Sequence, residues 1–499
     1  MALATLLGAP VASLWYFFYF AASAFLYPYM ALFYRRLGLP EHRIGLLAGM
    51  RPWVSGPSGP IFAGLADAYS CHGPLMIGMS IGALLTRLCF LGASGLPTET
   101  AKFGALMVLV IVSEVMSGPL TVLADACTVG SLDNDADYGK YRLWGAVSWG
   151  TVNGIAGGCI ALFGIYSLFG FYAAFAALAL IPAAKFDFGV LRAGAVGSHP
   201  HADSSPEGAP EVREVEMGEL DAHHREGAIS AADVHHRTGP SKPQSRRASV
   251  HQQERPAGRK GKEQEVGGAE GAGTARWRTV LGALRRPQLS SFLFIASVWG
   301  YCVGTIEGFL FLYLDQLGAS EVLMGVTLTV TCVAEVPVFH YVPRILSVVG
   351  TAAMVHVVCV AFVLRLGFYS VLGALPSPWL VLPIELLHGV TFGCAWAVGC
   401  IVARRGSPPG MQATFQGIFQ MLYFGFGHGV GGVAGGYIYE IYGPVAVFHT
   451  AGAVILVGWA AYSTWMVGLR AVGAAPHGDA EVEYAAVDTE EGGEGPAKA

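Results

Sequence analysis

Apolar residues fall into two blocks along the chain, on either side of one polar segment. Each block divides into six apolar runs of roughly 20 residues or more, the length with which an α-helix crosses a bilayer. The runs of the first block cover residues 11–34, 43–66, 74–95, 102–126, 141–164 and 167–187. Those of the second block cover residues 288–314, 321–343, 350–373, 378–403, 413–438 and 444–469. The pattern predicts an all-α membrane protein with twelve transmembrane helices in two six-helix halves.

The polar segment between the blocks is predicted to be a disordered linker. It is rich in Gly, Pro, Ser and charges of both signs, and it has few large apolar side chains. Such a segment cannot bury enough apolar surface to offset the entropy of ordering. We therefore expect an N-terminal half at residues 1–187, a linker at 188–286, a C-terminal half at 287–470 and an acidic disordered tail at 471–499. The linker's composition identifies no protein partner.

Basic residues near the helix ends predict the orientation of the chain. An even number of helices puts both termini and the linker on one side of the membrane. That side carries Lys140, Arg142, Lys185, Arg192, Arg276, Arg278, Arg285, Arg286, Arg344, Arg404, Arg405 and Arg470, and the other side carries Arg35, Arg36, Arg43 and Lys102. Because cytoplasmic loops hold the excess of Lys and Arg, the termini and the linker are predicted to be cytoplasmic. We expect a multi-pass protein of the plasma membrane or an endomembrane.

Composition supports the membrane prediction and narrows the partners. Hydrophobic residues make up 53% of the chain and charged residues only 13%, whereas about a quarter of a soluble domain is charged. A net charge of −5 argues against a nucleic-acid partner. The nine cysteines form no CxxC pair, and no nucleophile motif, metal-ligand spacing or phosphate-binding loop is present. We expect no enzyme activity, metal or cofactor; the expected partners are the lipid bilayer and a small solute.

Ionisable residues inside the apolar runs are the best indicators of function, because each costs at least about 2.5 kcal/mol at the membrane centre unless it faces a cavity or a partner. In the first half, Arg51 lies in the second helix, and the Gly56–Pro60 segment that follows predicts a kinked or broken helix. Glu114 and Asp125 share one face of the fourth helix at helical spacing. We predict that Arg51 and Glu114 contact the solute.

Asp125 and Arg142 are predicted to meet near the cytoplasmic edge. Asp125 ends the polar face of the fourth helix, and Arg142 enters the fifth helix at a similar level. Their pairing is interpreted as a structural bridge that gates the cavity, with a solute contact as the alternative.

The second half carries its own set of ionisable residues. Glu335 lies in the eighth helix and Arg365 in the ninth, while Glu385 and His388 are three residues apart on one face of the tenth. A carboxylate beside an imidazole and a guanidinium can change protonation when its partner moves, which is the chemistry of a proton relay. The alternative is a static network that only fixes packing.

Helix eleven carries a ladder of amides on one face. Gln412, Gln416, Gln420 and Tyr423 recur at helical spacing, followed by seven glycines up to Gly436. The amides suit hydrogen bonds to a hydroxyl-rich solute, and we predict Gln416 as a solute contact. Hydrogen bonding between helices explains the same ladder equally well.

Several motifs carry a resemblance to a known family. They are Met50-Arg51-Pro52, Tyr138-Gly139-Lys140-Tyr141-Arg142-Leu143-Trp144-Gly145, Glu335-Val336-Pro337, Leu364-Arg365, Glu385-Leu386-Leu387-His388-Gly389 and Ala413-Thr414-Phe415-Gln416-Gly417. Together with the six-plus-six plan, they resemble the major facilitator superfamily, in the branch of domain-containing protein 6 and the bacterial sugar and nucleoside proton symporters. The resemblance covers both halves but not the linker or tail. It implies two halves built from inverted repeats around a central site, and transport by alternating access.

One motif departs from the superfamily pattern. The loop after the second helix normally continues from an Asp into basic residues, but here Asp67 is followed by Ala68, Cys71 and His72. Asp67 is retained as a predicted gating residue without its usual companions. The leading hypothesis is a proton-coupled transporter in which Glu335, Arg365, Glu385 and His388 couple protons to solute movement. The alternative is a transport-inactive receptor or scaffold of the same fold.

Overall fold

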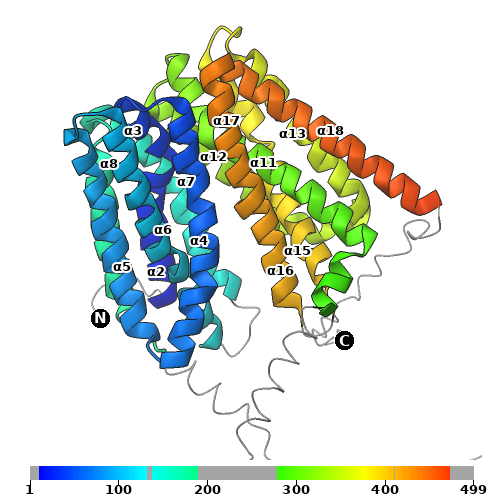
Figure 1. Ribbon diagram of the computed structural model, residues 1–499, viewed down its shortest axis with the longest axis horizontal. Helices are drawn as coiled ribbons and strands as arrows, with labels where there is room; N and C mark the ends of the chain where they lie inside the picture. The colour runs from blue at the N-terminus through cyan, green and yellow to red at the C-terminus, as the bar shows by residue number, and fades with distance from the viewer. Residues whose placement is uncertain (1–10, 132–137, 189–277, 409–410, 472–499) are drawn as a thin grey trace, which may run out of the picture. The chain divides into compact units, whose positions relative to one another are not determined.

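The computed structural model describes residues 11–131, 138–188, 278–408 and 411–471, and the statements below refer to these residues. The first six membrane-length segments are listed here in chain order. They are α2 (Val11–Leu26) continuing through a 3₁₀ turn (Tyr27–Tyr29) into α3 (Met30–Arg36), α4 (Glu41–Tyr69), α5 (His72–Leu88) with a 3₁₀ extension (Cys89–Gly95), α6 (Glu99–Gly130), α7 (Tyr138–Phe163) and α8 (Ser167–Ala183). Figure 1 shows these segments in blue to green.

The second six segments include two that change helix type along their length. Four of them are single helices: α11 (Pro287–Gln316), α12 (Glu321–Val349), α13 (Thr351–Leu372) and α18 (Pro444–Ala471). The tenth segment consists of a 3₁₀ turn (Pro378–Leu380), α14 (Val381–Glu385), a π-helix (Gly389–Cys394) and α15 (Ala395–Gly406). The eleventh segment consists of α16 (Gln412–Gln420), a π-helix (Met421–His428) and α17 (Gly429–Tyr442). π-Helical stretches inside α-helices are rare and frequently accompany functional sites.

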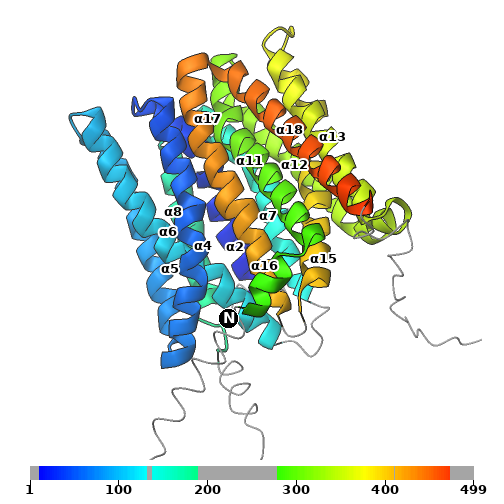
Figure 2. The ribbon, with the colours of Figure 1, turned by 45° about the vertical axis from the view of Figure 1, so that its right-hand side comes forward.

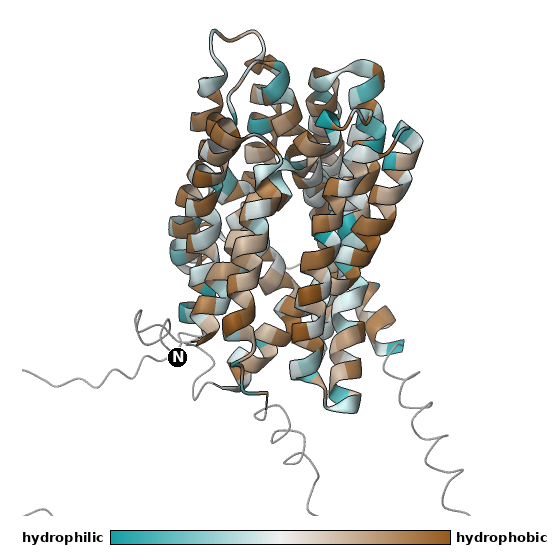
Figure 3. Cartoon of the chain, turned by 90° about the vertical axis from the view of Figure 1, so that its left-hand side faces the viewer, coloured by the Kyte–Doolittle hydropathy of each residue, from teal (hydrophilic) through white to brown (hydrophobic). Residues whose placement is uncertain are grey.

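These segments confirm the predicted fold class of twelve helices in two halves of six. Nine of the described helices are long and apolar enough to span a membrane. The other three segments are shorter or less apolar: α4 contains three prolines and several charges, α8 has only 17 residues, and the eleventh is rich in glycine and carries Gln, His and Glu side chains. Figure 3 shows hydrophobic residues over most of the helical surface, with hydrophilic ones concentrated at helix ends and a few internal positions.

Two local features differ from the sequence prediction. Of the two predicted forms of the second helix, kinked or broken, the break is wrong, because α4 runs continuously through Pro52, Pro57 and Pro60; the kink stays a prediction. Within it, the Ser55 hydroxyl donates to the Arg51 carbonyl at 3.0 Å, and the Ser58 hydroxyl donates to the Ser55 carbonyl at 2.9 Å. Changes of helix type occur instead in the first, third, tenth and eleventh segments.

The end of the predicted linker is helical. Residues 278–284 form a short helix before α11, and its Val280 and Ala283 side chains are buried in the main hydrophobic core. The predicted linker boundary at 286 therefore includes residues that pack on the membrane half. Residues 189–277 and the predicted tail after 471 lie outside the described residues.

The two halves meet along glycine-lined helix pairs, one of them α4 with α17 (Figure 2). A Cβ atom added at Gly45 would lie 2.5 Å from the Gly432 carbonyl oxygen, and one at Gly49 would lie 2.6 Å from the Gly429 carbonyl oxygen. Only glycine permits backbones to approach this closely without displacement. The pair α7 and α12 is similar: a Cβ at Gly154 would lie 2.8 Å from Thr329 Oγ1.

Polar contacts between the halves gather at one end of the bundle. Arg36 forms ion pairs with Asp315 at 3.5 Å and Glu321 at 3.8 Å. The His42 backbone N–H donates to Glu440 at 3.0 Å, and its imidazole contacts the same carboxylate. These residues lie near the end of α3, the beginnings of α4 and α12, and the ends of α11 and α17. This is the end of the bundle opposite the beginning of α2 and the end of α18, and the halves are closed there.

Replacing Gly45 by Val should open this closed end. Overpacking costs about 1–3 kcal/mol, which would raise the population of the open arrangement by roughly tenfold if the strain is relieved by opening. The reporter is a cysteine at Ala48, which lines the cavity described below, in a background without reactive native thiols. A membrane-impermeant maleimide applied to the side of residues 37–40 should label it faster.

The matched control is Gly64→Val on the same helix, because a Cβ at Gly64 meets nothing within 4 Å. Equal labelling rates in the two variants would contradict the claim that the close approach at Gly45 keeps the halves closed at this end.

Candidate functional site

A cavity of about 260 Å³ lies between the two halves. Residues from the 3₁₀ turn at Tyr27–Tyr29, α3, α4 and α7 line it on one side, and residues from α11–α13 and the tenth and eleventh segments line it on the other. Its ionisable lining residues are Arg51, Glu307, Glu335, Arg365, Glu385, His388 and His428. Aromatic lining is contributed by Tyr27, Tyr34, Trp149 and Phe311. The cavity therefore combines apolar walls with a small set of charged groups, as ligand sites commonly do.

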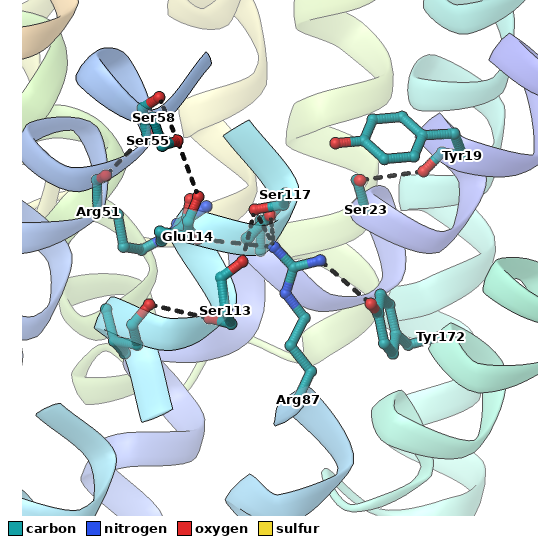
Figure 4. A network of polar contacts seen from close by, with 12 residues as sticks. Tyr19, Ser23, Arg51, Ser55, Ser58, Arg87, Ser113, Glu114, Ser117 and Tyr172 are labelled. Carbon is teal, nitrogen blue, oxygen red and sulfur yellow. Dashed lines mark hydrogen bonds and ion pairs between the residues drawn. The ribbon is translucent and has the colours of Figure 1, made fainter. Parts of the chain in front are cut away.

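The N-terminal half carries two arginines on one carboxylate (Figure 4). Arg51 Nε lies 3.2 Å from Glu114 Oε1, and an Arg87 guanidinium nitrogen lies 3.7 Å from the same oxygen. The Glu114 side chain is only 7% exposed and that of Arg87 only 4%. Because two guanidinium groups share one carboxylate, this cluster has an excess positive charge. Arg51 is its most exposed member, and it lines the cavity.

Arg87 is a functional candidate that the sequence reading missed. Its guanidinium donates to the Tyr172 hydroxyl at 3.1 Å, to Ser117 Oγ at 2.9 Å and to the Tyr27 hydroxyl. The signal was available: Arg87 is the one ionised residue of the apolar run at 74–95. The cost argument that singled out Arg51 applies equally to Arg87.

The Tyr27 ring joins the two arginines. The Arg51 guanidinium carbon lies 3.8 Å from the ring centroid, and that of Arg87 lies 4.9 Å from it. Such cation–π contacts are worth about 2 kcal/mol or more when they are desolvated. Tyr27 lies in the 3₁₀ turn that interrupts the first segment, so this change of helix type occurs where the ring meets both charges.

The C-terminal half is organised around Arg365, in α13. Its guanidinium donates to Glu385 at 2.8 Å, to Thr391 Oγ1 at 2.8 Å and to the Tyr369 hydroxyl at 3.1 Å. The Tyr369 hydroxyl in turn donates to the second Glu385 oxygen at 2.5 Å. The side chains of Arg365 and Glu385 are 3% and 2% exposed. Their charges therefore cancel inside a network that is almost closed to water.

His388 connects this network to the cavity. One Arg365 N–H group points at His388 Nδ1 over 3.2 Å. Arginine is a donor only, so Nδ1 must accept and the imidazole proton must sit on Nε2. Nε2 faces a Glu335 oxygen at 4.0 Å, and Glu335 lines the cavity. The residues Arg365, His388 and Glu335 thus form a chain from the sheltered ion pair to the cavity.

Glu307 and His428 form a second acid–imidazole pair that the sequence reading did not predict. Glu307 lies in α11, and His428 ends the π-helix of the eleventh segment. His428 Nε2 lies 3.1 Å from Glu307 Oε2, and the Glu307 side chain is 54% exposed because it faces the cavity. Both residues are ionisable groups in predicted apolar runs. Their pairing was not predicted because they are 121 positions apart in the chain.

The three predicted gating residues lie away from the cavity lining. Asp67 Oδ1 lies 2.8 Å from His72 Nε2, so His72 supplies a basic partner in the loop after α4. Asp125 accepts a hydrogen bond from the Tyr16 hydroxyl at 2.5 Å, and the Arg142 guanidinium lies 5.2 Å from the Tyr16 ring centroid. Tyr16 therefore contacts both residues of the predicted bridge. The gating roles stay predictions.

Gln416 also lies away from the cavity lining. Its amide donates to Cys400 Sγ at 2.9 Å, between the tenth and eleventh segments. This contact matches the interhelical alternative, and a solute contact stays a prediction. Within the described part of the chain, no group of three or more His, Cys, Asp or Glu side chains is arranged to hold a metal ion.

Glu385→Gln should lower the thermal unfolding midpoint of the purified protein more than an exposed acid-to-amide change does. It leaves Arg365 as an uncompensated buried charge, and breaking one partner of a buried pair costs roughly 3–5 kcal/mol. Glu99→Gln is the matched control, because Glu99 pairs with Arg43 at 3.0 Å but is 47% exposed. Intrinsic tryptophan fluorescence during heating measures both.

The double variant Arg365→Met with Glu385→Met removes both charges, so it should recover part of the lost midpoint. If Glu385→Gln unfolds at the same temperature as Glu99→Gln, Arg365 and Glu385 do not form the sheltered pair described above.

The fold is shared with solved membrane transporters. The crystal structure of the nucleoside transporter NupG matches with a TM-score of 0.65 at 13% identity, covering 91% of this chain and 98% of that one. A crystal structure of a D-xylose-proton symporter matches with a TM-score of 0.55 at 11% identity, covering 91% and 95%. At these identities the likeness concerns the fold alone.

Sequence relatives come from animals and bacteria. The chain is 28% identical over 156 residues to major facilitator superfamily domain-containing protein 6-like protein A of Xenopus laevis, covering 31% of this chain and 25% of that protein. It is 23% identical over 148 residues to the uncharacterized transporter YwbF of Bacillus subtilis, covering 30% and 36%. The matched regions thus span only about a quarter to a third of these relatives. The model of the MFS_1 like family matches residues 11–450, so the chain belongs to this family of the major facilitator type, as the sequence motifs predicted.

Proposed function

We propose that this membrane protein is a secondary active transporter that carries a small organic solute together with protons by alternating access. The observation that carries the proposal is the orientation of His388. Its Nδ1 faces Arg365 and its Nε2 faces Glu335, so a carboxylate in the cavity is linked through one imidazole to a sheltered ion pair. Through such a link, a change in the protonation of the cavity carboxylate can change how the helices pack.

In the proposed mechanism, Glu335 takes up the coupled proton. When Glu335 is charged it attracts the Nε2–H of His388, which holds α12 against the tenth segment. Protonation removes this attraction and weakens the contact between the two segments. The adjacent Gly389 packs on Ala334 and Val338 of α12, and Gly393 packs on Val338, so no side chain at these two positions of the tenth segment holds it away from α12.

Arg365 and Glu385 act as a fixed reference in this scheme. Their mutual pairing and the Tyr369 hydroxyl keep both charges satisfied at all times. Arg365 therefore always presents a donor to His388, and the imidazole stays in one tautomer. Solute binding is assigned to the opposite wall, where Arg51 lines the cavity and Glu114 orients it.

The alternative of a transport-inactive receptor or scaffold was suggested by the altered loop after Asp67. The contact between Asp67 Oδ1 and His72 Nε2 at 2.8 Å favours transport instead, because the acid of this loop keeps a hydrogen-bonding partner. Closure of the halves at one end together with a charged central cavity also suits a transporter. Solute exchange across liposomes by the reconstituted protein separates the two functions directly.

Glu335→Gln should abolish accumulation of solute driven by a pH gradient while leaving solute exchange within about threefold of the native rate. The amide mimics a permanently protonated carboxyl, so it removes proton coupling but keeps the shape of the site. Both rates are measured in proteoliposomes with a labelled solute.

The matched control is Glu99→Gln, which removes one negative charge outside the cavity and should leave the rates of accumulation and exchange unchanged. If Glu335→Gln still accumulates solute against its gradient when the pH gradient is the sole driving force, Glu335 is not the coupling residue.

A further inference from the structure

The two walls of the cavity carry opposite charge. On the N-terminal wall, Arg51 and Arg87 share the single carboxylate of Glu114, at 3.2 and 3.7 Å from the same oxygen. One positive charge is therefore in excess. Arg87 is sheltered by Tyr27, Ser117 and Tyr172, so Arg51 presents this charge to the cavity.

The C-terminal wall has an excess of negative charge. Arg365 and Glu385 cancel each other, which leaves the two cavity carboxylates Glu307 and Glu335. Arg365 requires the imidazole of His388 to accept at Nδ1, so this residue adds no charge. His428 is alike in this respect. Its Nδ1 is buried without a partner among the described residues, so a second N–H there would be unsatisfied.

An excess charge on each wall is costly in a membrane interior when it has no partner. Protonation of Glu335 in the proposed mechanism neutralises one of the two carboxylates. Glu307 and Arg51 remain, one on each half of the protein. A solute with charges of both signs satisfies both groups at once and bridges the two halves.

The size of the cavity limits the solute. Sites for drug-sized ligands measure roughly 300–1,000 Å³, and this cavity measures about 260 Å³. A metabolite with about one ring fits it. Tyr34, Trp149 and Phe311 supply apolar and aromatic wall for the uncharged part of such a molecule.

We propose that the transported solute is a small zwitterion, with an ammonium group bound by Glu307 and a carboxylate or similar anion bound by Arg51. This inference rests on the proposed transport function and names its substrate class. It makes Glu307 and Arg51 the residues that determine specificity, and it leaves Glu335 for the proton. Neutral polyols of the same size would leave the excess charge of each wall unbalanced.

The test uses two matched series of probes on the purified full chain. One series is tyrosine, tyramine, 3-(4-hydroxyphenyl)propionate and 3-(4-hydroxyphenyl)propanol; the other is 5-aminopentanoate, pentylamine, pentanoate and pentanol. Each series varies charge on one skeleton. Stabilisation against heat is measured as a function of probe concentration. On at least one skeleton, the zwitterion should stabilise at a concentration about tenfold lower than either singly charged member, since each charged contact contributes about 1.5–3 kcal/mol.

Variants assign each charge to its residue. Glu307→Gln should remove the advantage of the zwitterion over the anion, and Arg51→Gln should remove its advantage over the amine. Glu99→Gln, which lies outside the cavity, should retain both advantages. Unliganded unfolding midpoints of the variants show whether each one is folded, and Glu307→Gln is the safer change because Glu307 is the more exposed.

The inference is overturned if the neutral member binds best, if charge makes no difference, or if no probe of either series stabilises the protein. Transport is measured separately, as exchange of the best probe across liposomes. A zwitterion that binds through Glu307 and Arg51 without being exchanged would support the substrate class and contradict the transport function. Exchange of a neutral solute alone would do the reverse.

Discussion

The structure depends on one constraint, which is that an ionised side chain inside a membrane must find a partner within the protein or face water in a cavity. Each half meets the constraint in its own way. Glu114 neutralises one of the two arginines that surround it, and Arg365 and Glu385 neutralise each other. The excess charges that these pairs leave, on Arg51, Glu307 and Glu335, line the central cavity. The positions of the charges therefore follow from the cost of placing them anywhere else, and the cavity is where the unbalanced ones can remain.

Glycine determines how the halves close around that cavity. At Gly45 and Gly49 a methyl group would overlap the facing backbone, and at Gly154 it would overlap the Thr329 side chain, so the glycine main chain itself makes these contacts. Between helices in a membrane there is no hydrophobic effect to drive association, and close packing takes its place. The ion pairs of Arg36 reinforce the same end. The proposed alternating access requires a contact that can both close and reopen, and small residues with exposed ion pairs suit such a contact.

The sequence predicted features that depend on spacing along one helix better than features that depend on how helices pack. The twelve segments followed from apolar run length, and the meeting of Glu385, His388 and Arg365 followed from a three-residue spacing and a lone arginine nearby. The pairing of Glu307 with His428 did not follow, because it depends on where α11 and the eleventh segment cross. Arg87 could have been predicted, because it is the one ionised residue of the apolar run at 74–95 and carries the same energetic cost as Arg51. Gln416 shows the limit of helical spacing, since its face packs on Cys400 in this conformation.

The two cavity carboxylates illustrate why similar acids can serve different ends. Glu335 faces the His388 imidazole, whose other nitrogen accepts from Arg365. A change in the charge of Glu335 therefore affects the hydrogen-bonded network around Arg365. Glu307 faces an imidazole whose other nitrogen meets no partner in the described chain, so a change in its charge stays local. A coupling residue must transmit its state, whereas a binding residue must only attract its ligand. The different surroundings of the two imidazoles are therefore the physical basis for proposing Glu335 as the proton site and Glu307 as the solute site.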